Sequence, residues 1–77
     1  MERLLALREV SGLSQFTVAR KSDVSRMRLS LAETGQLTLS DEEEARIRAV
    51  LLIAIEARSL RLRAVLADSR TEAEISG

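Results

Sequence analysis

The stretch that decides the fold is residues 12–35, GLSQFTVARKSDVSRMRLSLAETG, and it predicts two short helices joined by a tight turn. The first helix is predicted over residues 15–21 and the second over residues 26–33, with Asp23 in the turn between them. A serine stands directly before each helix, where its side-chain oxygen can accept the unpaired backbone N–H groups of the first turn. The apolar residues of this stretch are spaced so that the two helices pack at a steep angle.

One face of the second helix stays free when its apolar face is packed, and it carries Arg26, Met27, Arg28, Ser30 and Leu31. This layout is typical of a helix-turn-helix, whose second helix enters the DNA major groove. Arginine suits bidentate contact with guanine, and methionine or leucine can meet the methyl group of thymine. We therefore predict that these five residues contact bases. Arg26 and Arg28 lie about 200° apart around a helix, so Arg26 is expected to read a base while Arg28 reaches a base edge or a phosphate.

The same residues resemble the phage repressor and Cro-like (XRE) helix-turn-helix family, whose usual form is LRxxxGLSQxxLAxxxGVSxxxISxxExG. The resemblance runs without a gap from about Leu4 to Leu51 and includes Gly, Ser, Gln and Glu at fixed offsets. Two residues depart from the pattern: Asp23 replaces the glycine usual in the turn, and Leu39 replaces a common proline. Aspartate tolerates a left-handed backbone better than most residues, so we expect the turn to form.

The resemblance implies that Gln15 contacts the DNA backbone and that the loop after the second helix runs along the phosphates. The predicted backbone contacts are Gln15, Arg20, Ser25, Thr34, Gln36 and Thr38. Arg20 and Lys21 have a second interpretation, because they could simply keep the helix soluble. Phe16 stands where the family has a polar residue, and the sequence leaves open whether it is a partly exposed aromatic or a satellite of the core.

Residues 2–10 predict a first helix with Leu4, Leu7 and Val10 on one apolar stripe. Gly12 suits the left-handed residue that ends this helix, after which the chain returns to the core. Leu37 and Leu39 of the later loop are also predicted to be core residues, and Glu33 is expected to form a structural bond near the end of its helix.

Residues 40–44, SDEEE, predict the start of a further helix. Ser40 can cap it, Glu43 stands at the third helical position of a capping box, and the carboxylates suit the positive end of the helix dipole. A metal site is the weaker interpretation, because consecutive acidic residues cannot converge on one face of a helix.

This last helix is predicted to continue without a breaker to about Ala67, roughly 40 Å at 1.5 Å per residue. Ile47, Val50, Leu51 and Ala54 can close the core. A second stripe has nothing left in this chain to pack on and is predicted to be a dimer interface, made of Ile53, Ala57, Leu60, Ala64 and Ala67. A further row is expected to flank it, made of Ile55, Ser59, Leu62 and Leu66. A break near Ser59, with a fifth helix folding back, is the alternative.

Composition restricts the function. The 77 residues are enough for one domain and contain no Pro, Cys or His and a single aromatic residue, which favours an all-α protein and excludes disulfides and Cys or His metal and nucleophilic sites. No catalytic residues, metal or cofactor are predicted.

Net charge is zero, but residues 1–39 hold six Lys and Arg against four Asp and Glu. No signal peptide or membrane span is evident, so a cytoplasmic location is expected.

These observations predict an all-α, four- to five-helix repressor-like bundle with an extended C-terminal helix. Residues 1–55 would form the DNA-binding part, residues 53–68 a helical dimerisation segment, and residues 69–77 a flexible tail. The predicted function is a sequence-specific regulator of transcription, a repressor that binds an inverted repeat of double-stranded DNA as a homodimer. The rival hypothesis is an antitoxin-like interaction module whose C-terminal helix binds a different protein.

Overall fold

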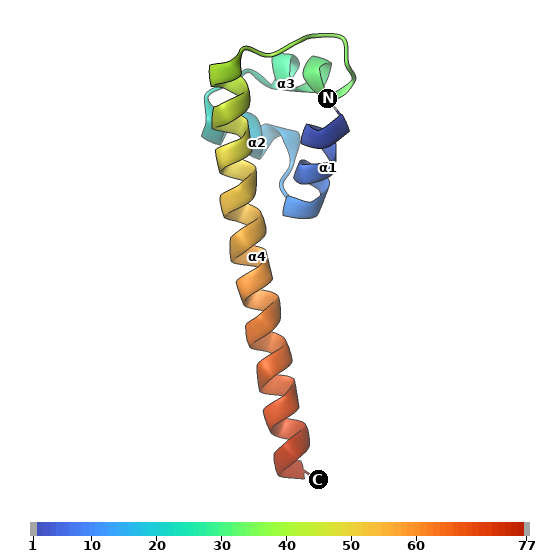
Figure 1. Ribbon diagram of the computed structural model, residues 1–77, viewed down its shortest axis with the longest axis vertical. Coiled ribbons are helices and arrows are strands. Elements are labelled where there is room, and N and C mark those ends of the chain that lie inside the picture. The colour runs from blue at the N-terminus through green and yellow to red at the C-terminus, as the bar shows by residue number, and fades with distance from the viewer. Residues whose placement is uncertain (1, 77) are drawn as a thin grey trace.

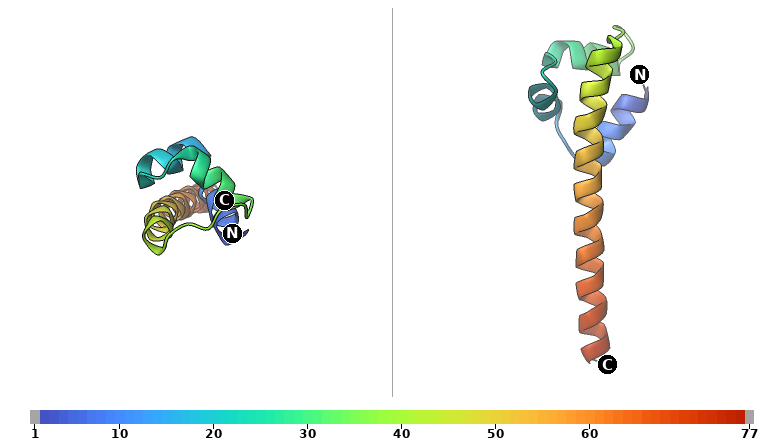
Figure 2. Two further views of the ribbon diagram at one scale, coloured as in Figure 1. Left: turned by 90° about the horizontal axis from the view of Figure 1, so that it is seen from above. Right: turned by 60° about the vertical axis from the view of Figure 1, so that its left-hand side comes forward.

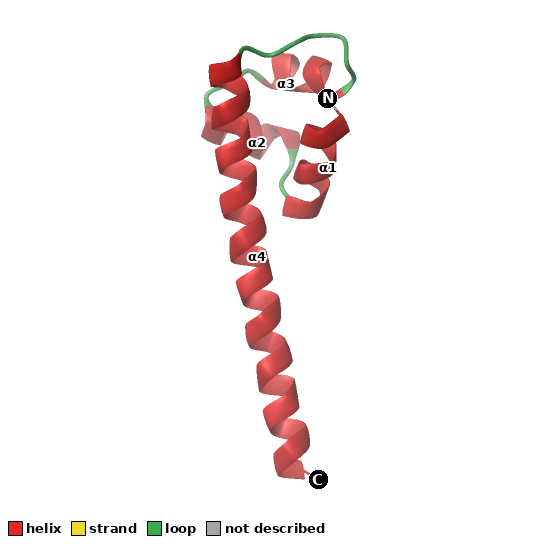
Figure 3. Cartoon of the chain, viewed as in Figure 1, coloured by secondary structure: helices red, strands yellow, loops and turns green. Residues whose placement is uncertain are grey.

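The computed structural model describes the backbone of residues 2–76 and the side chains of residues 3–68, and this part of the chain is helical, with no strand (Figures 1 and 3). The elements are α1 (Glu2–Ser11), α2 (Gln15–Ser22), α3 (Arg26–Glu33) and α4 (Asp41–Ser76). The all-α prediction is confirmed. None of the described helices has the length and apolar character needed to cross a membrane.

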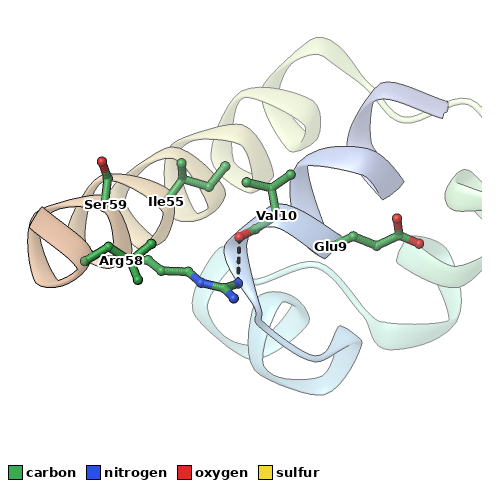
Figure 4. Close-up of a pocket in the computed structure, with 6 residues that line it drawn as sticks. Glu9, Val10, Ile55, Arg58 and Ser59 are labelled. Atoms are coloured by element: carbon green, nitrogen blue, oxygen red, sulfur yellow. Dashed lines mark hydrogen bonds between the residues drawn. The ribbon is translucent and has the colours of Figure 1, made fainter. Parts of the chain in front are cut away.

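Helix α1 ends where the sequence indicates, at a glycine with a left-handed backbone. Gly12 has a φ of 76°, and its N–H donates to the carbonyl of Arg8 at 3.2 Å. Leu4 is buried and Leu7 packs against the core, as expected, but Val10 is 57% exposed. Val10 shares the apolar stripe of α1 but is exposed, because the end of α1 that carries it lies beside α4 and lines an open groove (Figure 4).

Helices α2 and α3 are capped by the two serines that precede them. The Oγ of Ser14 accepts the N–H of Thr17 at 3.1 Å, and the Oγ of Ser25 accepts the N–H of Arg28 at 3.1 Å. Asp23 closes the turn with φ 58° and ψ 39°, which are left-handed values. Aspartate therefore does here what glycine usually does, at some cost in backbone strain.

The core is built almost wholly from aliphatic side chains. Its buried members come from all four helices, from the turn between α2 and α3 and from the loop before α4, and they are Leu4, Val18, Ala19, Val24, Leu29, Ala32, Leu39, Ile47 and Leu51. Leu37 is half-buried and packs against this cluster, while Val50 and Ala54 are half-buried at its edge. We call the part that surrounds this core, residues 3–55, the head.

Helix α4 starts with the predicted capping box and then leaves the head. The N–H of Glu43 donates to the Oγ of Ser40 at 3.1 Å, and the N–H of Ser40 donates back to the carboxylate of Glu43 at 3.0 Å. From there α4 runs as one helix of 36 residues, which gives the molecule its longest dimension of 55 Å (Figures 1 and 2). The break considered near Ser59 does not occur, and the helix passes the predicted end at Ala67. The side chains of the predicted flexible tail, residues 69–77, lie outside the described residues.

Candidate functional site

The outward face of α3 is centred on Met27. Leu29 and Ala32 are buried on the opposite side of the helix, and Met27 is 73% exposed. Ser30 and Leu31 are half-buried on the same side as Met27, one turn further along. Figure 1 shows α3 at the end of the head from which α4 starts, with the rest of α4 leading away from it. The predicted base-contacting residues thus form one surface.

The two arginines of α3 flank this surface on opposite sides, and they differ in their bonding. Arg26 is exposed and has no ion-pair partner among the described side chains. Arg28 reaches towards α4, where its Nη2 and Nε lie 2.7 and 2.9 Å from the two carboxylate oxygens of Glu43. The bond is bidentate, and it occupies one edge of the guanidinium group. The second edge, formed by Nη1 and the remaining hydrogen of Nη2, keeps its donors for another acceptor.

Glu43 carries two bonds that favour its ionised form. The hydrogen bonds from Arg28 and from the backbone N–H of Ser40 lower the pKa of the Glu43 carboxyl to about 2, and the same contact raises the pKa of Arg28. The pair therefore stays charged through the range of pH in which proteins are usually studied. It joins the first turn of α3 to the first turn of α4 and so fixes how α3 is presented.

A second polar cluster holds the far end of α3. The side chain of Glu33 is only 4% exposed, and its carboxylate accepts bonds from Nε of Arg8 at 2.6 Å and from Nε2 of Gln15 at 2.8 Å. The structural bond expected of Glu33 is present. Gln15 lies at the start of α2, so this carboxylate ties α1, α2 and α3 together. Gln15 is half-buried, and one of the two N–H groups of its side-chain amide is donated to Glu33.

The other residues predicted to contact the DNA backbone border α3 and its following loop. Arg20, Ser25, Gln36 and Thr38 have exposed side chains. Thr34 is exposed too, but its hydroxyl donates to backbone carbonyls of α3, and the N–H of Gln36 donates to the carbonyl of Leu31 at 2.8 Å. Backbone N–H groups at the start of this loop are therefore used to close α3.

The predicted dimer stripe lies on the part of α4 that leaves the head. Ile53 and Leu60 are 70% and 56% exposed, and the alanines of the stripe are exposed between and beyond them. Next to the head the stripe begins in a shallow groove lined by Lys21, Val50, Ile53, Ala54 and Ala57.

A different apolar surface lies on the other side of α4. At 100° per residue, Ile55, Leu62 and Leu66 fall roughly opposite the dimer stripe rather than beside it, which corrects the expected flanking arrangement. Ile55 and Leu62 line an open groove with Val10 of α1, and Nη1 of Arg58 donates to the carbonyl of Val10 at 2.9 Å (Figure 4). Phe16 on α2 is 59% exposed, which answers the question left by the sequence in favour of an exposed aromatic.

The bonds that hold this site were only partly visible in the sequence. Glu43 was expected to cap α4, but no linear pattern places it against Arg28, fifteen positions earlier. The bond from Arg58 to α1 was not anticipated either, since the two residues it joins are 48 positions apart. Within the described side chains, no group of three or more acidic, histidine or cysteine residues is arranged to hold a metal ion.

Comparison of the chain with protein-family models, with curated proteins and with solved structures finds no match.

Proposed function

We propose that the chain is a sequence-specific double-stranded DNA-binding protein in which α2, the turn at Asp23 and α3 form a helix-turn-helix. The observation that carries this proposal is the outward face of α3, where exposed Met27 lies between two arginines. An apolar centre with cationic flanks suits a helix in the major groove, because the centre meets base edges while the flanks lie near the phosphate walls.

The rigidity of α3 supports the same proposal. Ser25 caps its first turn, Glu43 holds Arg28, and the bonds of Glu33 fix its last turn against α1 and α2. A helix that reads base edges has to be presented in a single orientation, and binding then costs little ordering entropy. Arg26 would supply the bidentate contact to guanine, with Ser30 and Leu31 beside it.

The charge balance predicts that little of the affinity for DNA comes from sequence-independent attraction and most from recognition by α3. With a net charge of zero, the sequence-independent attraction to phosphate is expected to be modest. Two copies of α3 acting together on an inverted repeat, with half-sites about 34 Å apart, would compensate for this. The resemblance to the phage repressor and Cro-like family supports this function and suggests a cytoplasmic repressor of transcription.

Nuclear magnetic resonance tests where DNA binds. The 8.5 kDa chain, labelled with ¹⁵N, is titrated with a mixed-sequence duplex at moderate salt. We expect amide shifts concentrated on α3, on the start of α2 and on residues 34–38. Shifts confined to α4 beyond residue 55, or no shifts at millimolar duplex, would contradict the proposal.

The second candidate is an antitoxin-like module that binds a different protein, and the groove beside Val10 favours it. Leu62, which lines this groove, and Leu66, one turn further along α4, are 57% and 63% exposed and are not part of the dimer stripe. This candidate would be favoured if the purified chain is monomeric or binds no duplex.

A further inference from the structure

Among the described side chains, the charges on the projecting part of α4 form no ion pair within their own helix. Near the head, opposite charges are four positions apart and pair along α4, as Glu42 does with Arg46 at 3.3 Å and Glu44 with Arg48 at 3.1 Å. Beyond the head the spacing changes to five positions, which puts the two charges on different sides of one helix. No ion pair within the chain involves these charges among the described side chains.

The five-residue spacing matches the geometry of two parallel helices. The dimer stripe follows a heptad repeat, with Ala57 and Ala64 at one apolar position and Ile53, Leu60 and Ala67 at the other. Val50, at the edge of the core, is in the register of Ala57. The residues that flank this seam are then Glu56 and Arg63 on one side and Arg61 and Asp68 on the other. In a parallel, in-register pair, each residue of the first flank faces the residue five positions later on the partner helix.

We propose that α4 pairs with α4 of a second copy of this chain, parallel and in register, along the dimer stripe. Glu56 would then face Arg61 of the second copy and Arg63 would face Asp68, so that every flanking pair is of opposite sign on both sides of the seam. All four side chains are exposed in the single chain.

An antiparallel pair matches these charges only in part. In an antiparallel pair, residues of the same flank face each other. Glu56 then meets Arg63 of the second copy only when the two-fold axis passes between residues 59 and 60. Arg61 then faces the neighbourhood of Arg58, and Asp68 faces that of Leu51. Only the parallel register pairs all four charges at once.

The parallel arrangement also decides how the heads are presented. In a single chain α3 lies at the end of the head from which α4 starts (Figure 1). In a parallel pair, with the two-fold axis along α4, both heads and both α3 helices would therefore lie at the same end. The alanines at the seam let the two helices approach closely. This inference deepens the homodimer of the proposed function and rests on it, but its test needs no DNA.

Single cysteines test orientation and register, because the chain has no cysteine of its own. Ala57→Cys and Ala64→Cys lie one heptad apart on the seam, and Leu62→Cys lies on the opposite face as the control. Under mild oxidation we expect each seam variant to cross-link to its own copy at least tenfold faster than the control. Seam variants that cross-link to their own copies no faster than the control, whether or not the two cross-link to each other in a mixture, would show that the helices are not paired in parallel register along this stripe. That result overturns the proposal.

Charge exchange gives an independent readout. Glu56→Arg alone and Arg61→Glu alone each place like charges opposite each other twice per dimer, so each is expected to weaken dimerisation about tenfold. The double variant restores opposite signs and should return the dimer dissociation constant to within about threefold of the parent. A double variant weaker than both singles would contradict the parallel register. If the chain pairs in this register but binds no duplex, this inference stands and the proposed function is refuted.

Discussion

Nη2 of Arg28 lies 2.7 Å from the carboxylate of Glu43, which connects the first turn of α3 to the capping box of α4. Glu43 thus serves two elements at once, because the same carboxylate also accepts the backbone N–H of Ser40. The orientation of the proposed recognition helix therefore depends on a residue outside it.

The Arg28–Glu43 contact makes stability depend on acid pH. The pKa of Glu43 is lowered from 4.5 to about 2, so its stabilising contribution is fully present above about pH 4.5 and is lost as pH falls towards 2. We expect Glu43→Gln to melt at a lower temperature than the parent at pH 7, and the gap to close between pH 4.5 and 2. Glu42→Gln, which removes the same charge one residue away, serves as the control. A gap that stays constant with pH would show that the carboxylate of Glu43 is not held in this way.

Removing Arg8 should destabilise the fold. Arg8→Met would leave the carboxylate of Glu33, 4% exposed, with Gln15 as its remaining partner. Because Arg8 is itself 20% exposed and water can partly replace it, we expect a loss below the usual range for buried pairs, about 2–3 kcal/mol in urea unfolding. Arg3→Met, on the same helix and exposed, should change stability by less than about 0.5 kcal/mol. Equal losses for the two variants would mean that the Glu33 cluster contributes little.

Arg26 is the side chain expected to read a base. Arg26→Ala should weaken binding to the preferred site by about 1–3 kcal/mol and relax the preference at one base pair, measured by fluorescence anisotropy on a panel of single-base variants. An equal loss on every duplex would mean that Arg26 touches only phosphate.

Dimerisation and DNA binding should fail together. Leu60→Glu places a charge in the dimer stripe, and we expect it to shift the mass measured by light scattering towards the monomer and to lower DNA affinity at least tenfold. Leu62→Glu makes the same change on the opposite face, where both properties should survive. If Leu62→Glu is the variant that dissociates, the dimer uses the groove beside Val10.

Most of the fold could be predicted from local sequence signals. The serines before α2 and α3 and the capping box at Glu43 act within one helical turn, so the sequence located the helix starts. The sequence predicted an end of α4 near Ala67, whereas the helix continues to Ser76. No glycine or proline in residues 52–68 marks where a helix that leaves the head should stop. Val10 shares the apolar stripe of α1 and is nevertheless exposed, because helical periodicity says which residues share a face and not where a neighbouring helix ends.

The candidate site was predictable in its residues but not in its bonds. The free face of α3 follows from the apolar spacing, so Arg26, Met27 and Arg28 could be named in advance. That Glu43 holds Arg28 depends on how α4 crosses α3, which is a property of the packed core. Gln15, expected at the DNA backbone, has its amide N–H bonded to Glu33 for the same reason.

DNA recognition by a pair of α3 helices can be tested by selecting binding sites from a random pool of duplex DNA, with the purified chain at near-physiological salt. We predict enrichment of an inverted repeat whose half-sites are centred about one helical turn, or about 34 Å, apart. A single half-site would keep α3 as the reading helix and remove the dimer. Recovery of no enriched sequence would contradict DNA recognition by α3.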